Sequence, residues 1–455
     1  MKVKNSILLC AVAATILFFT ACQKDEDITC NETNWYQDAD GDGLGNPAVS
    51  ILDCDQPAGY VSNNNDNDDT TVSDNGNGNN NGNNGGNNPT DLSSVAAAFG
   101  GSINLSNLLN YENQAIPNYI DEDNTGNNPI TNEGATLGRI LFYDKNLSVD
   151  NTISCASCHK QQFAFGDDNL QSTGVDGLTG RHSMRLINAR FAEERRFFWD
   201  ERANTLEAQT TMPIQDHVEM GFSGQNGDPG INDLIEKLEG IGYYQELFEF
   251  VYGDANITEQ RMQNALAQFI RSIQSFDSKY DQGRSQVNNN NNPFPNFTQQ
   301  ENQGKNLFMS NNGAACNRCH QAPEFGIDNN TDNNGVVGVI GNPNAIDVTI
   351  TRSPTLRDMF NPSGQLNGPL MHDGSMATML DVINHYDDIP IVPGNNNLDN
   401  RLRGGGGGPG GGGGNNNGQN LNLSNQEKDA LIAFLRTLGG TDVYTDERWS
   451  NPFGD

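Results

Sequence analysis

Apolar residues recur three and four positions apart in two segments in the second half of the chain, a spacing that places them on one face of a helix. The first segment begins after Thr258 and carries Met262, Ala265, Leu266, Phe269 and Ile270. The second begins after Ser424, carries Ala430, Leu431, Phe434 and Leu435, and ends at Gly439-Gly440. Ser and Thr are favoured at helix N-termini and Gly at helix C-termini. Because alternating apolar and polar runs are scarce, the sequence predicts a mainly α fold with long loops.

A continuous apolar run, Ile7 to Phe19, follows Lys2 and Lys4. It is too short for a comfortable membrane span and ends in a Thr-Ala-Cys sequence at Cys22, which resembles a bacterial lipobox. We therefore expect residues 1–22 to be a lipoprotein signal and Cys22 to carry a lipid anchor, facing the periplasm or exposed on the outer-membrane surface. Ordinary cleavage that leaves Cys22 unmodified is the alternative.

Residues 23–62 are predicted to form a small acidic module, closed by Cys30 and Cys54, which are expected to form a disulfide in an oxidising compartment. Carboxylates alternate with Gly and Ala in its loop, at Asp38, Asp40 and Asp42. Ca²⁺ prefers oxygen ligands on a turning backbone, so these three aspartates are candidate calcium ligands. The twelfth loop position is Val49 and not Glu, which disfavours an EF-hand; the module more closely resembles a thrombospondin type 3 repeat. An acidic spacer without calcium is the alternative.

Two segments rich in Asn and Gly lack the apolar residues that a core requires. We expect residues 63–92 to be a disordered linker and residues 404–418 to be a surface loop within a folded domain. The formal net charge of the 455 residues is −32, with 26 Lys and Arg against 58 Asp and Glu. This charge disfavours nucleic acid as a partner and would suit a basic protein such as a small cytochrome c. A solubilising acidic surface explains the same composition.

The strongest chemical signal is a pair of CxxCH motifs. The first contains Cys155, Cys158 and His159, and the second contains Cys316, Cys319 and His320. Two Cys three positions apart can each form a thioether to a haem vinyl group, and the following His becomes the proximal iron ligand. A zinc site would need a second ligand pair near each motif, and a thioredoxin-like site would need a βαβ context. The sequence therefore predicts two covalently bound haem c groups, in domains 93–292 and 293–455.

Further motifs around these two resemble the di-haem cytochrome c peroxidase/MauG family, in the family's order and over residues 115 to 455. They are Leu137-Gly138-Arg139, Leu141-Phe142-Tyr143-Asp144, Phe198-Trp199-Asp200-Glu201-Arg202-Ala203, Leu206-Glu207-Ala208-Gln209, Val218-Glu219-Met220-Gly221, Ser353-Pro354-Thr355-Leu356-Arg357 and Met371-His372-Asp373-Gly374. The resemblance implies two cytochrome c-like helical domains around a cleft. It also implies an oxidoreductase that reduces hydrogen peroxide with electrons from a cytochrome c or a similar redox protein.

The resemblance assigns roles around the N-terminal, peroxidatic haem. Glu219 matches a distal acid/base, Gln209 its hydrogen-bonding partner, and Trp199 an aromatic residue between the haems that relays electrons. Many family members supply a removable distal His where this sequence has Val175. We therefore expect this haem to be five-coordinate or weakly aquated, with His182 as the alternative distal ligand.

For the C-terminal, electron-transfer haem, family peroxidases place a Met ligand 14 positions after the His of the His-Asp-Gly motif. Counting from His372, this position is Tyr386, and MauG and its close relatives also carry Tyr there. A phenolate stabilises ferric over ferrous iron, so the potential should fall relative to a Met ligand. We expect Tyr386 to be the sixth ligand, against nearby competitors His385, Met371, Met376 and Met379.

The resemblance also implies a Ca²⁺ ion between the haems, held near Asn367 and Pro369 and at the position of His182 or Ser183, while His372 anchors a haem propionate or orders the cleft. Three functions remain open at this stage. The chain is a peroxidase that uses protein-delivered electrons, a MauG-like enzyme that oxidises a protein or peptide side chain, or an electron-transfer cytochrome without catalysis. An open iron position beside an acidic side chain separates the first two from the third.

Overall fold

The computed structural model describes residues 33–37, 46–53, 57, 59–62, 92–193, 195–311, 313–404 and 417–454. The chain divides into two compact units, Met1–Gly86 and Asn87–Asp455, which we describe separately. Among the described residues, no helix is both long and apolar enough to cross a bilayer. The expected signal, including Cys22, lies outside the described residues.

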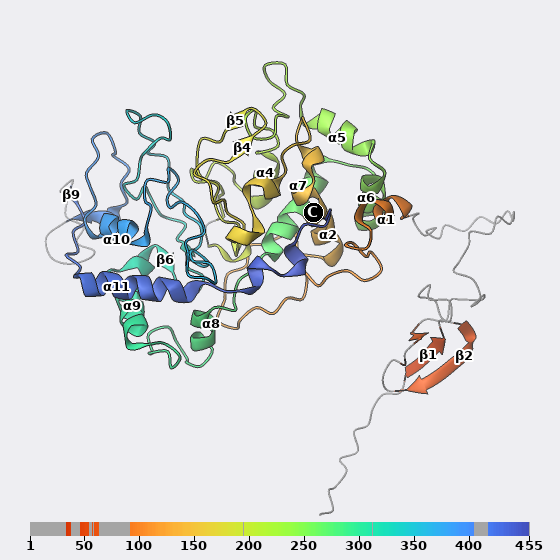
Figure 1. Ribbon diagram of the computed structural model, residues 1–455, viewed down its shortest axis with the longest axis horizontal. Helices are drawn as coiled ribbons and strands as arrows, with labels where there is room; N and C mark the ends of the chain where they lie inside the picture. The colour runs from red at the N-terminus through yellow and green to blue at the C-terminus, as the bar shows by residue number, and fades with distance from the viewer. Residues whose placement is uncertain are drawn as a thin grey trace, which may run out of the picture. The chain divides into compact units, whose positions relative to one another are not determined.

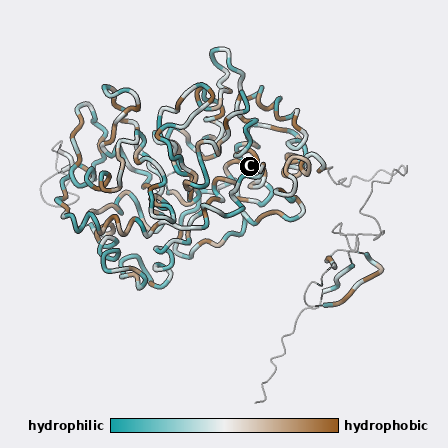
Figure 2. The backbone as a smooth tube through the Cα atoms, in the orientation of Figure 1, coloured by the Kyte–Doolittle hydropathy of each residue, from teal (hydrophilic) through white to brown (hydrophobic). Residues whose placement is uncertain are grey.

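The described part of the first unit is a three-stranded antiparallel sheet with strand order β2-β1-β3 (Figure 1). Its strands are β1 (Thr33–Gln37), β2 (Asn46–Asp53) and β3 (Tyr60–Val61). Thr33 pairs with Asp53, and the register shifts between Tyr36 and Gln37. The β2 strand lies at the sheet edge and exposes three apolar side chains, those of Val49, Ile51 and Leu52. Figure 2 colours much of the backbone of this strand as hydrophobic. The sequence pattern did not lead us to expect these strands.

The predicted calcium ligands of this module, Asp38, Asp40 and Asp42, lie outside the described residues, as do Cys30 and Cys54. The linker 63–92 is described only at its last residue, Leu92, which precedes α1. The module's calcium site, its disulfide and the linker's disorder therefore stay predictions.

The second unit is largely helical in its described part, as predicted. Its helices are α1 (Ser93–Phe99), α2 (Asn132–Tyr143), α3 (Cys155–Cys158), α4 (Leu206–Thr211), α5 (Ile231–Glu239), α6 (Gly242–Tyr252), α7 (Glu259–Ser272), α8 (Lys279–Arg284), α9 (Gln299–Met309), α10 (Met379–Asp387) and α11 (Asn425–Leu435). Its strands form two-residue antiparallel pairs: β4 (Thr173–Gly174) with β5 (Gly177–Leu178), β6 (His320–Gln321) with β7 (Gly326–Ile327), and β8 (Arg403–Gly404) with β9 (Asn417–Gly418).

Two helices confirm the spacing argument and the predicted caps. The Thr258 hydroxyl accepts a hydrogen bond from the Arg261 backbone N–H (3.2 Å) at the start of α7. At α11, the Glu427 carboxylate accepts from the Ser424 backbone N–H (2.8 Å), and the Ser424 hydroxyl accepts from the Glu427 N–H (3.4 Å). This reciprocal capping box satisfies two backbone donors at the helix start.

The same helix crossing occurs twice in the second unit. In α2, a methyl group at Gly138 would overlap a carbonyl oxygen of α7, and in α9 a methyl group at Gly304 would overlap a carbonyl oxygen of α11. The partners correspond residue by residue: Ala265 and Phe269 for Gly138, and Ala430 and Phe434 for Gly304. Each CxxCH motif thus lies in a half that is built on the same close packing of two helices.

Replacing Gly304 by Ala should force α9 and α11 apart, because backbone atoms of α11 occupy the space for the new methyl group. We expect a loss of about 1–3 kcal/mol in the free energy of unfolding of the haem-loaded protein, measured by denaturant titration. Gly230→Ala is the control, since its methyl group meets its nearest atom at 3.5 Å, an ordinary contact. Equal stability of both variants would contradict a tight crossing.

Two apolar cores support the two haem motifs, and the chain crosses between them. Most of the first core lies before Ile273, but Val443 and Trp449 from the end of the chain belong to it. The second core extends from Tyr280 in α8 to Leu438. In Figure 1 the C-terminus accordingly lies beside α2 and α7, away from α11.

Hydrogen bonds fix the returning C-terminal segment to α2. The Tyr143 hydroxyl donates to the Trp449 carbonyl (2.6 Å), and the Arg139 guanidinium donates to the Ser450 carbonyl and hydroxyl (2.7 and 3.0 Å). Arg139 is only 2% exposed, so these bonds satisfy a buried cation. Arg139, which belongs to the first family-like motif, therefore stabilises the contact between α2 and the C-terminal segment.

A buried ion pair between Arg357 and Asp281 joins the segment after the second haem motif to α8. We call it the Arg357–Asp281 pair. Two guanidinium nitrogens of Arg357 donate to the two carboxylate oxygens of Asp281, at 2.8 and 2.9 Å. The same carboxylate accepts a hydrogen bond from the Tyr119 hydroxyl (2.9 Å), and Arg357 also donates to the Pro323 carbonyl (2.9 Å). Arg357 is 0% and Asp281 5% exposed. The pair therefore connects four distant segments of the second unit.

Candidate active site

The first CxxCH motif lies in the wall of a cavity that we call the N-terminal cavity. Its two Cys occupy one turn of α3, whose start is held by a hydrogen bond from the Ser154 backbone N–H to the Ser157 hydroxyl (3.0 Å). Cys155, Cys158 and His159 all line this cavity. Apolar side chains complete much of the wall: Phe142, Ile153, Leu186, Ile187, Phe197, Leu206, Met220, Leu266 and Ile270.

The His159 ring is oriented as an iron ligand would need to be. Its Nδ1 lies 3.1 Å from the Phe165 carbonyl oxygen, and since a carbonyl only accepts, Nδ1 donates. This bond leaves Nε2 as the unprotonated nitrogen. Burial also lowers the pKa of His159, which favours the neutral ring that binds metals.

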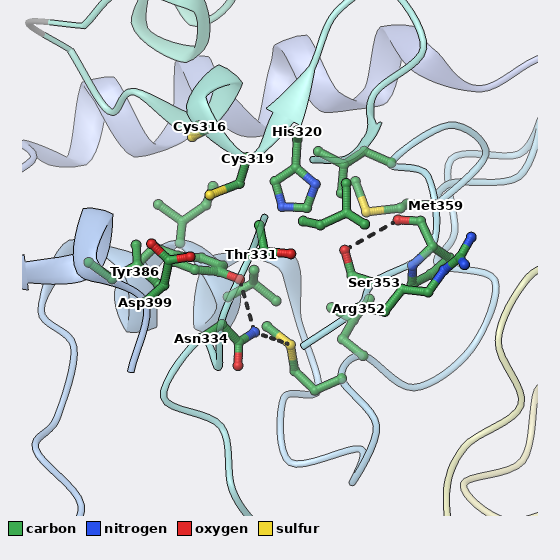
Figure 3. Close-up of a pocket in the computed structure, with 18 of the residues that line it drawn as sticks. Cys316, Cys319, His320, Thr331, Asn334, Arg352, Ser353, Met359, Tyr386 and Asp399 are labelled. Atoms are coloured by element: carbon green, nitrogen blue, oxygen red, sulfur yellow. Dashed lines mark hydrogen bonds between the residues drawn. The ribbon is translucent and has the colours of Figure 1, made fainter. Parts of the chain in front are cut away.

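The second motif lies in the wall of the C-terminal cavity, which Figure 3 shows. Cys316 begins a short 3-10 helix, Cys316–Arg318, and His320 begins β6; Cys319 lies between them. Figure 3 shows the His320 ring and the Cys319 thiol extending into the cavity from one side, with Tyr386 and Asn334 facing them. Burial lowers the pKa of His320 to about 4, so the ring is neutral, and its Nδ1 is buried without a hydrogen-bond partner.

The two cavities share one wall. Its residues, which line both cavities, are His182, Ser183, Met184, Arg185, Trp199, Ile327, Arg352, Ser353 and Pro354. The Trp199 indole N–H donates to the His182 carbonyl (2.8 Å), and its ring lies edge-on to His372 with centroids 6.1 Å apart. The structure therefore places Trp199 between the two motifs, where the resemblance put it.

Arg185 brings a buried cation to this shared wall. Its guanidinium donates to the Thr355 carbonyl (2.9 Å), while its Nε is buried without a hydrogen-bond partner. Burial lowers the pKa of Arg185, although the charges of Tyr444 and Asp358 act in the opposite direction. Haem carries anionic propionates, which would offset this positive charge. The donors, apolar walls and buried cation together fit two haem groups, each held by one CxxCH motif. The sequence did not single out Arg185.

Glu219 lies in the wall of the N-terminal cavity on a short turn that three contacts fix. The Asp216 carboxylate accepts hydrogen bonds from the backbone N–H groups of Val218 (2.9 Å) and Glu219 (3.0 Å). The tip of the β4–β5 hairpin donates to the same turn, through Val175 N–H to the Glu219 carbonyl (3.1 Å). Burial raises the pKa of the Glu219 carboxyl to about 7, with the Asp216 charge acting in the same direction and Arg202 opposing both.

The other predicted residues of this cavity are placed as follows. Gln209, in α4, also lines it. Besides His159, the imidazole lining it in the described part of the chain is that of His182, whose Nδ1 donates to the Asn169 carbonyl (2.9 Å). Val175 is occupied in backbone pairing with Glu219.

Among the candidate sixth ligands of the C-terminal cavity, Tyr386, Met371 and Met379 line it. The Tyr386 hydroxyl accepts a hydrogen bond from the Asn334 side-chain amide (3.0 Å). His385 instead donates from Nε2 to the Asn334 carbonyl (2.9 Å). Burial raises the pKa of Tyr386, and the hydrogen bond from Asn334 opposes this rise. Asn334, in an Asn-rich stretch, is a second residue that the sequence did not single out.

The predicted inter-haem calcium ligands lie near the shared wall. Pro369 and His182 both line the C-terminal cavity, and Asn367 donates from its side chain to the Asp358 carbonyl and the Tyr444 hydroxyl, at 2.7 Å each. The Asn367 Oδ1 is buried without a hydrogen-bond partner. Within the described ranges, no group of three or more His, Cys, Asp or Glu side chains is arranged to hold a metal ion. Calcium held largely by carbonyl oxygens stays a prediction.

Comparison with known proteins agrees with this geometry. Residues 132–289 match the family model described as di-haem cytochrome c peroxidase. The chain is 30% identical over 325 residues to the methylamine utilization protein MauG of Methylophilus methylotrophus, covering 69% of this chain and 84% of that protein. It is 26% identical over 326 residues to the cytochrome c551 peroxidase of Nitrosomonas europaea, covering 69% and 81%.

The fold is similar to a solved structure of a MauG-like protein associated with microbial copper homeostasis. The TM-score is 0.57 at 26% sequence identity, and the match covers 75% of this chain and 99% of that one. Relatives of both kinds, peroxidases and MauG, therefore match more than two thirds of the chain.

Proposed function

Since this chain belongs to the di-haem cytochrome c peroxidase/MauG family, we propose that it reduces hydrogen peroxide to water in the N-terminal cavity. The electrons come from a small cytochrome c or a similar redox protein, for which the net charge of −32 favours a basic surface. The observation that carries the proposal is Glu219, a carboxyl with a pKa of about 7 in the wall of the cavity that holds the first CxxCH motif.

Reduction of one peroxide molecule cleaves the O–O bond, consumes two electrons and two protons, and releases two waters. The family implies two haem c groups, which supply the iron that exchanges these electrons. Cys155, Cys158 and His159 would hold the first group, and Cys316, Cys319, His320 and Tyr386, which line the C-terminal cavity, would hold the second.

Glu219 moves the proton. It takes a proton from one peroxide oxygen and returns it to the other, so that the leaving oxygen departs as water. A pKa of about 7 suits both directions of transfer, because the carboxyl is present in both protonation states at neutral pH. The Gln209 amide, which lines the same cavity, orients the peroxide by hydrogen bonding. Trp199, in the shared wall, relays electrons between the two cavities.

A second function, oxidation of a protein or peptide side chain as in MauG, is favoured by one specific pair of observations. Tyr386 occupies the C-terminal cavity where a Met ligand would suit an electron-storing peroxidase, and Val175 offers no removable distal ligand. Such a site would react with peroxide before any donor electron arrives.

Spectroscopy of the ferric haem-loaded protein tests the proposal. We expect one high-spin haem and one low-spin, six-coordinate haem by EPR and ultraviolet–visible absorption, and a rapid spectral change on adding peroxide. Turnover of peroxide with reduced cytochrome c supports the peroxidase. A peroxide reaction without such turnover favours the MauG-like function. Two low-spin haems and no peroxide reaction would leave an electron-transfer cytochrome.

We also propose the setting of this activity. A lipid anchor at Cys22 would hold the protein at the cell envelope, with residues 63–92 as its tether. Calcium would bind between the haems through Asn367, Pro369 and His182, and in the N-terminal module through Asp38, Asp40 and Asp42. A Cys22→Ala variant tests the localisation, because it removes the lipid site and changes no residue of either cavity. The variant should be released from washed membranes, whereas the wild type should stay bound.

A further inference from the structure

We propose that Asn334 is a positioning residue that commits the sixth ligand position of the C-terminal haem to the oxygen of Tyr386 and withholds it from the sulfur of Met371. This inference rests on the proposed ligation by Tyr386 and adds the residue that selects it.

One amide nitrogen contacts both candidate ligands. The Asn334 Nδ2 lies 3.0 Å from the Tyr386 hydroxyl oxygen and 3.8 Å from the Met371 sulfur. Both contacts are drawn as dashed lines in Figure 3, on the side of the cavity opposite His320. Asn334, Tyr386 and Met371 all line this cavity. The amide is therefore placed to favour one of the two over the other.

The orientation of this amide is fixed by its other end. The Asn334 Oδ1 accepts a hydrogen bond from the Val336 backbone N–H (3.0 Å), and a backbone N–H can only donate. The NH₂ end must therefore face Tyr386. The Asn334 carbonyl in turn accepts from His385 Nε2 (2.9 Å), so adjacent residues of α10 are both fastened to Asn334.

The loop that carries Asn334 is itself rigidly held. Asn333 is 0% exposed, and its side chain donates to the carbonyls of Val336 (3.2 Å) and Ile350 (3.0 Å). Its Oδ1 accepts from the Gly335 N–H (2.8 Å) and from the Asn395 amide (2.9 Å). The donor at Asn334 is thus preorganised, and it need not be reoriented when a ligand binds.

Met371 is a real competitor. Its backbone has φ of +68°, a left-handed conformation that is uncommon for a residue with a side chain and that recurs at functional sites. Its side chain nevertheless lines the cavity, beside the same amide as Tyr386. Without a selecting group, the cavity would offer iron a thioether as well as a phenol.

The chemistry of the donor decides between them. A hydrogen bond from an amide N–H to an ionised oxygen is charge-assisted and about twice as strong as a neutral one, whereas a thioether sulfur is a weak acceptor. Asn334 therefore stabilises the anionic oxygen of Tyr386 far more than the sulfur of Met371. Since a Met ligand raises haem potentials, this selection holds the potential of the C-terminal haem low.

Asn334→Asp tests the proposal in the haem-loaded protein. Aspartate has nearly the same shape and keeps the acceptor for Val336, but it cannot donate to Tyr386 and brings a negative charge to the phenolate oxygen. We expect loss of the phenolate-to-iron charge-transfer absorption and of the phenolate resonance Raman bands, together with an upward shift of one midpoint potential. The haem content should stay unchanged. Asn334→Ala, which adds no charge, should act in the same direction.

Asn395→Asp is the matched control. It also removes one amide donor to this loop, the bond from Asn395 to Asn333, and keeps the acceptor for the Asn397 N–H (3.0 Å), but Asn395 makes no hydrogen bond to Tyr386. The control should keep the spectrum and the potential of the wild type. Adding Met371→Leu to Asn334→Asp should reverse the rise in potential, because the replacement ligand is then removed.

The outcomes separate the proposal from the function on which it rests. If Tyr386→Phe leaves both haem spectra unchanged, Tyr386 is not the ligand, and both the ligation and the selection fail. If Tyr386→Phe alters one spectrum while Asn334→Asp and Asn334→Ala do not, the ligation stands and the role of Asn334 is refuted. The same refutation follows if Asn395→Asp shifts the potential as much as Asn334→Asp does.

Discussion

Replacing Glu219 by Gln is expected to slow the reaction with hydrogen peroxide by about 10²–10⁴-fold, while both haems remain bound. Gln keeps the size and hydrogen-bonding capacity of the side chain but cannot carry a proton between the two peroxide oxygens. The rate is measured by stopped-flow absorption with the ferric protein at increasing peroxide concentration. Glu219 lines the N-terminal cavity but belongs to neither CxxCH motif, so haem content should be normal.

Glu236→Gln is the control for this variant, because it makes the same change of charge on the exposed face of α5. It should leave the peroxide rate unaltered. An undiminished rate in Glu219→Gln would refute the assignment of Glu219 as the proton carrier. It would not affect the expectation that each CxxCH motif binds a haem.

The raised pKa of Glu219 also gives a pH dependence with a definite sign. The folded-state pKa of about 7 exceeds the ordinary value of 4.5, so folding favours the protonated carboxyl. Its contribution to stability is fully present below pH 4.5 and is lost as the pH rises through 7. Glu219→Gln removes this loss. As the pH rises from 4.5 to 7, the unfolding midpoint of Glu219→Gln should therefore increase relative to that of the wild type.

Replacing Arg357 by Met should reduce the free energy of unfolding by about 3–5 kcal/mol, the cost of leaving one member of a buried ion pair without its partner. The variant leaves the Asp281 carboxylate, 5% exposed, with only its hydroxyl and backbone donors. Denaturant titration of the haem-loaded protein, followed by circular dichroism and Soret absorption, measures the loss.

Two further variants check that the charge is responsible. Adding Asp281→Asn to Arg357→Met neutralises the stranded carboxylate and should recover part of the lost stability. Arg261→Met breaks an exposed pair with Asp254 and should leave the unfolding midpoint in place. Equal stability of Arg357→Met and the wild type would show that the Arg357–Asp281 pair does not hold the four segments together.

The Arg357–Asp281 pair also predicts acid sensitivity. Burial alone would raise the pKa of Asp281, but the charge and hydrogen bonds of Arg357 hold this pKa below its ordinary value of 3.8. Its stabilising contribution is therefore present above pH 3.8 and is lost as the pH falls through the lower, folded-state pKa. In Arg357→Met the charge that opposes burial is gone, so the variant should recover part of its lost stability relative to the wild type as the pH falls and the Asp281 carboxyl is protonated.

Features that depend on a short stretch of sequence could be predicted. The helices after Thr258 and Ser424 begin at those caps because apolar spacing and capping are both local. The CxxCH motifs were readable because their chemistry needs three residues within five positions. The family resemblance, now confirmed, placed Trp199 and Glu219, and the structure brings both to the cavity walls.

Features that depend on distant residues could not be predicted. Asn334 lies in a stretch of Asn, Asp and Gly that has the composition of a linker. What distinguishes it from its neighbours is the hydrogen bond to Tyr386, 52 residues away in the sequence, which only the folded structure shows. Arg185 is one of several arginines in its region, and its importance comes from lying in the wall shared by both cavities. The strand β2 could not be predicted because its exposed apolar residues Val49, Ile51 and Leu52 do not follow a clean alternation.

The return of the C-terminal segment to the first core has a consequence for biogenesis. Trp449 is 1% exposed, and it packs in a core whose other residues are mostly synthesised hundreds of positions earlier. Tyr143 bonds to Trp449, and Arg139 bonds to Ser450. The first core therefore lacks two of its buried side chains until Val443 and Trp449 have been synthesised. Haem attachment at Cys155 and Cys158 would then take place either before Val443 and Trp449 join the first core or after they have completed it.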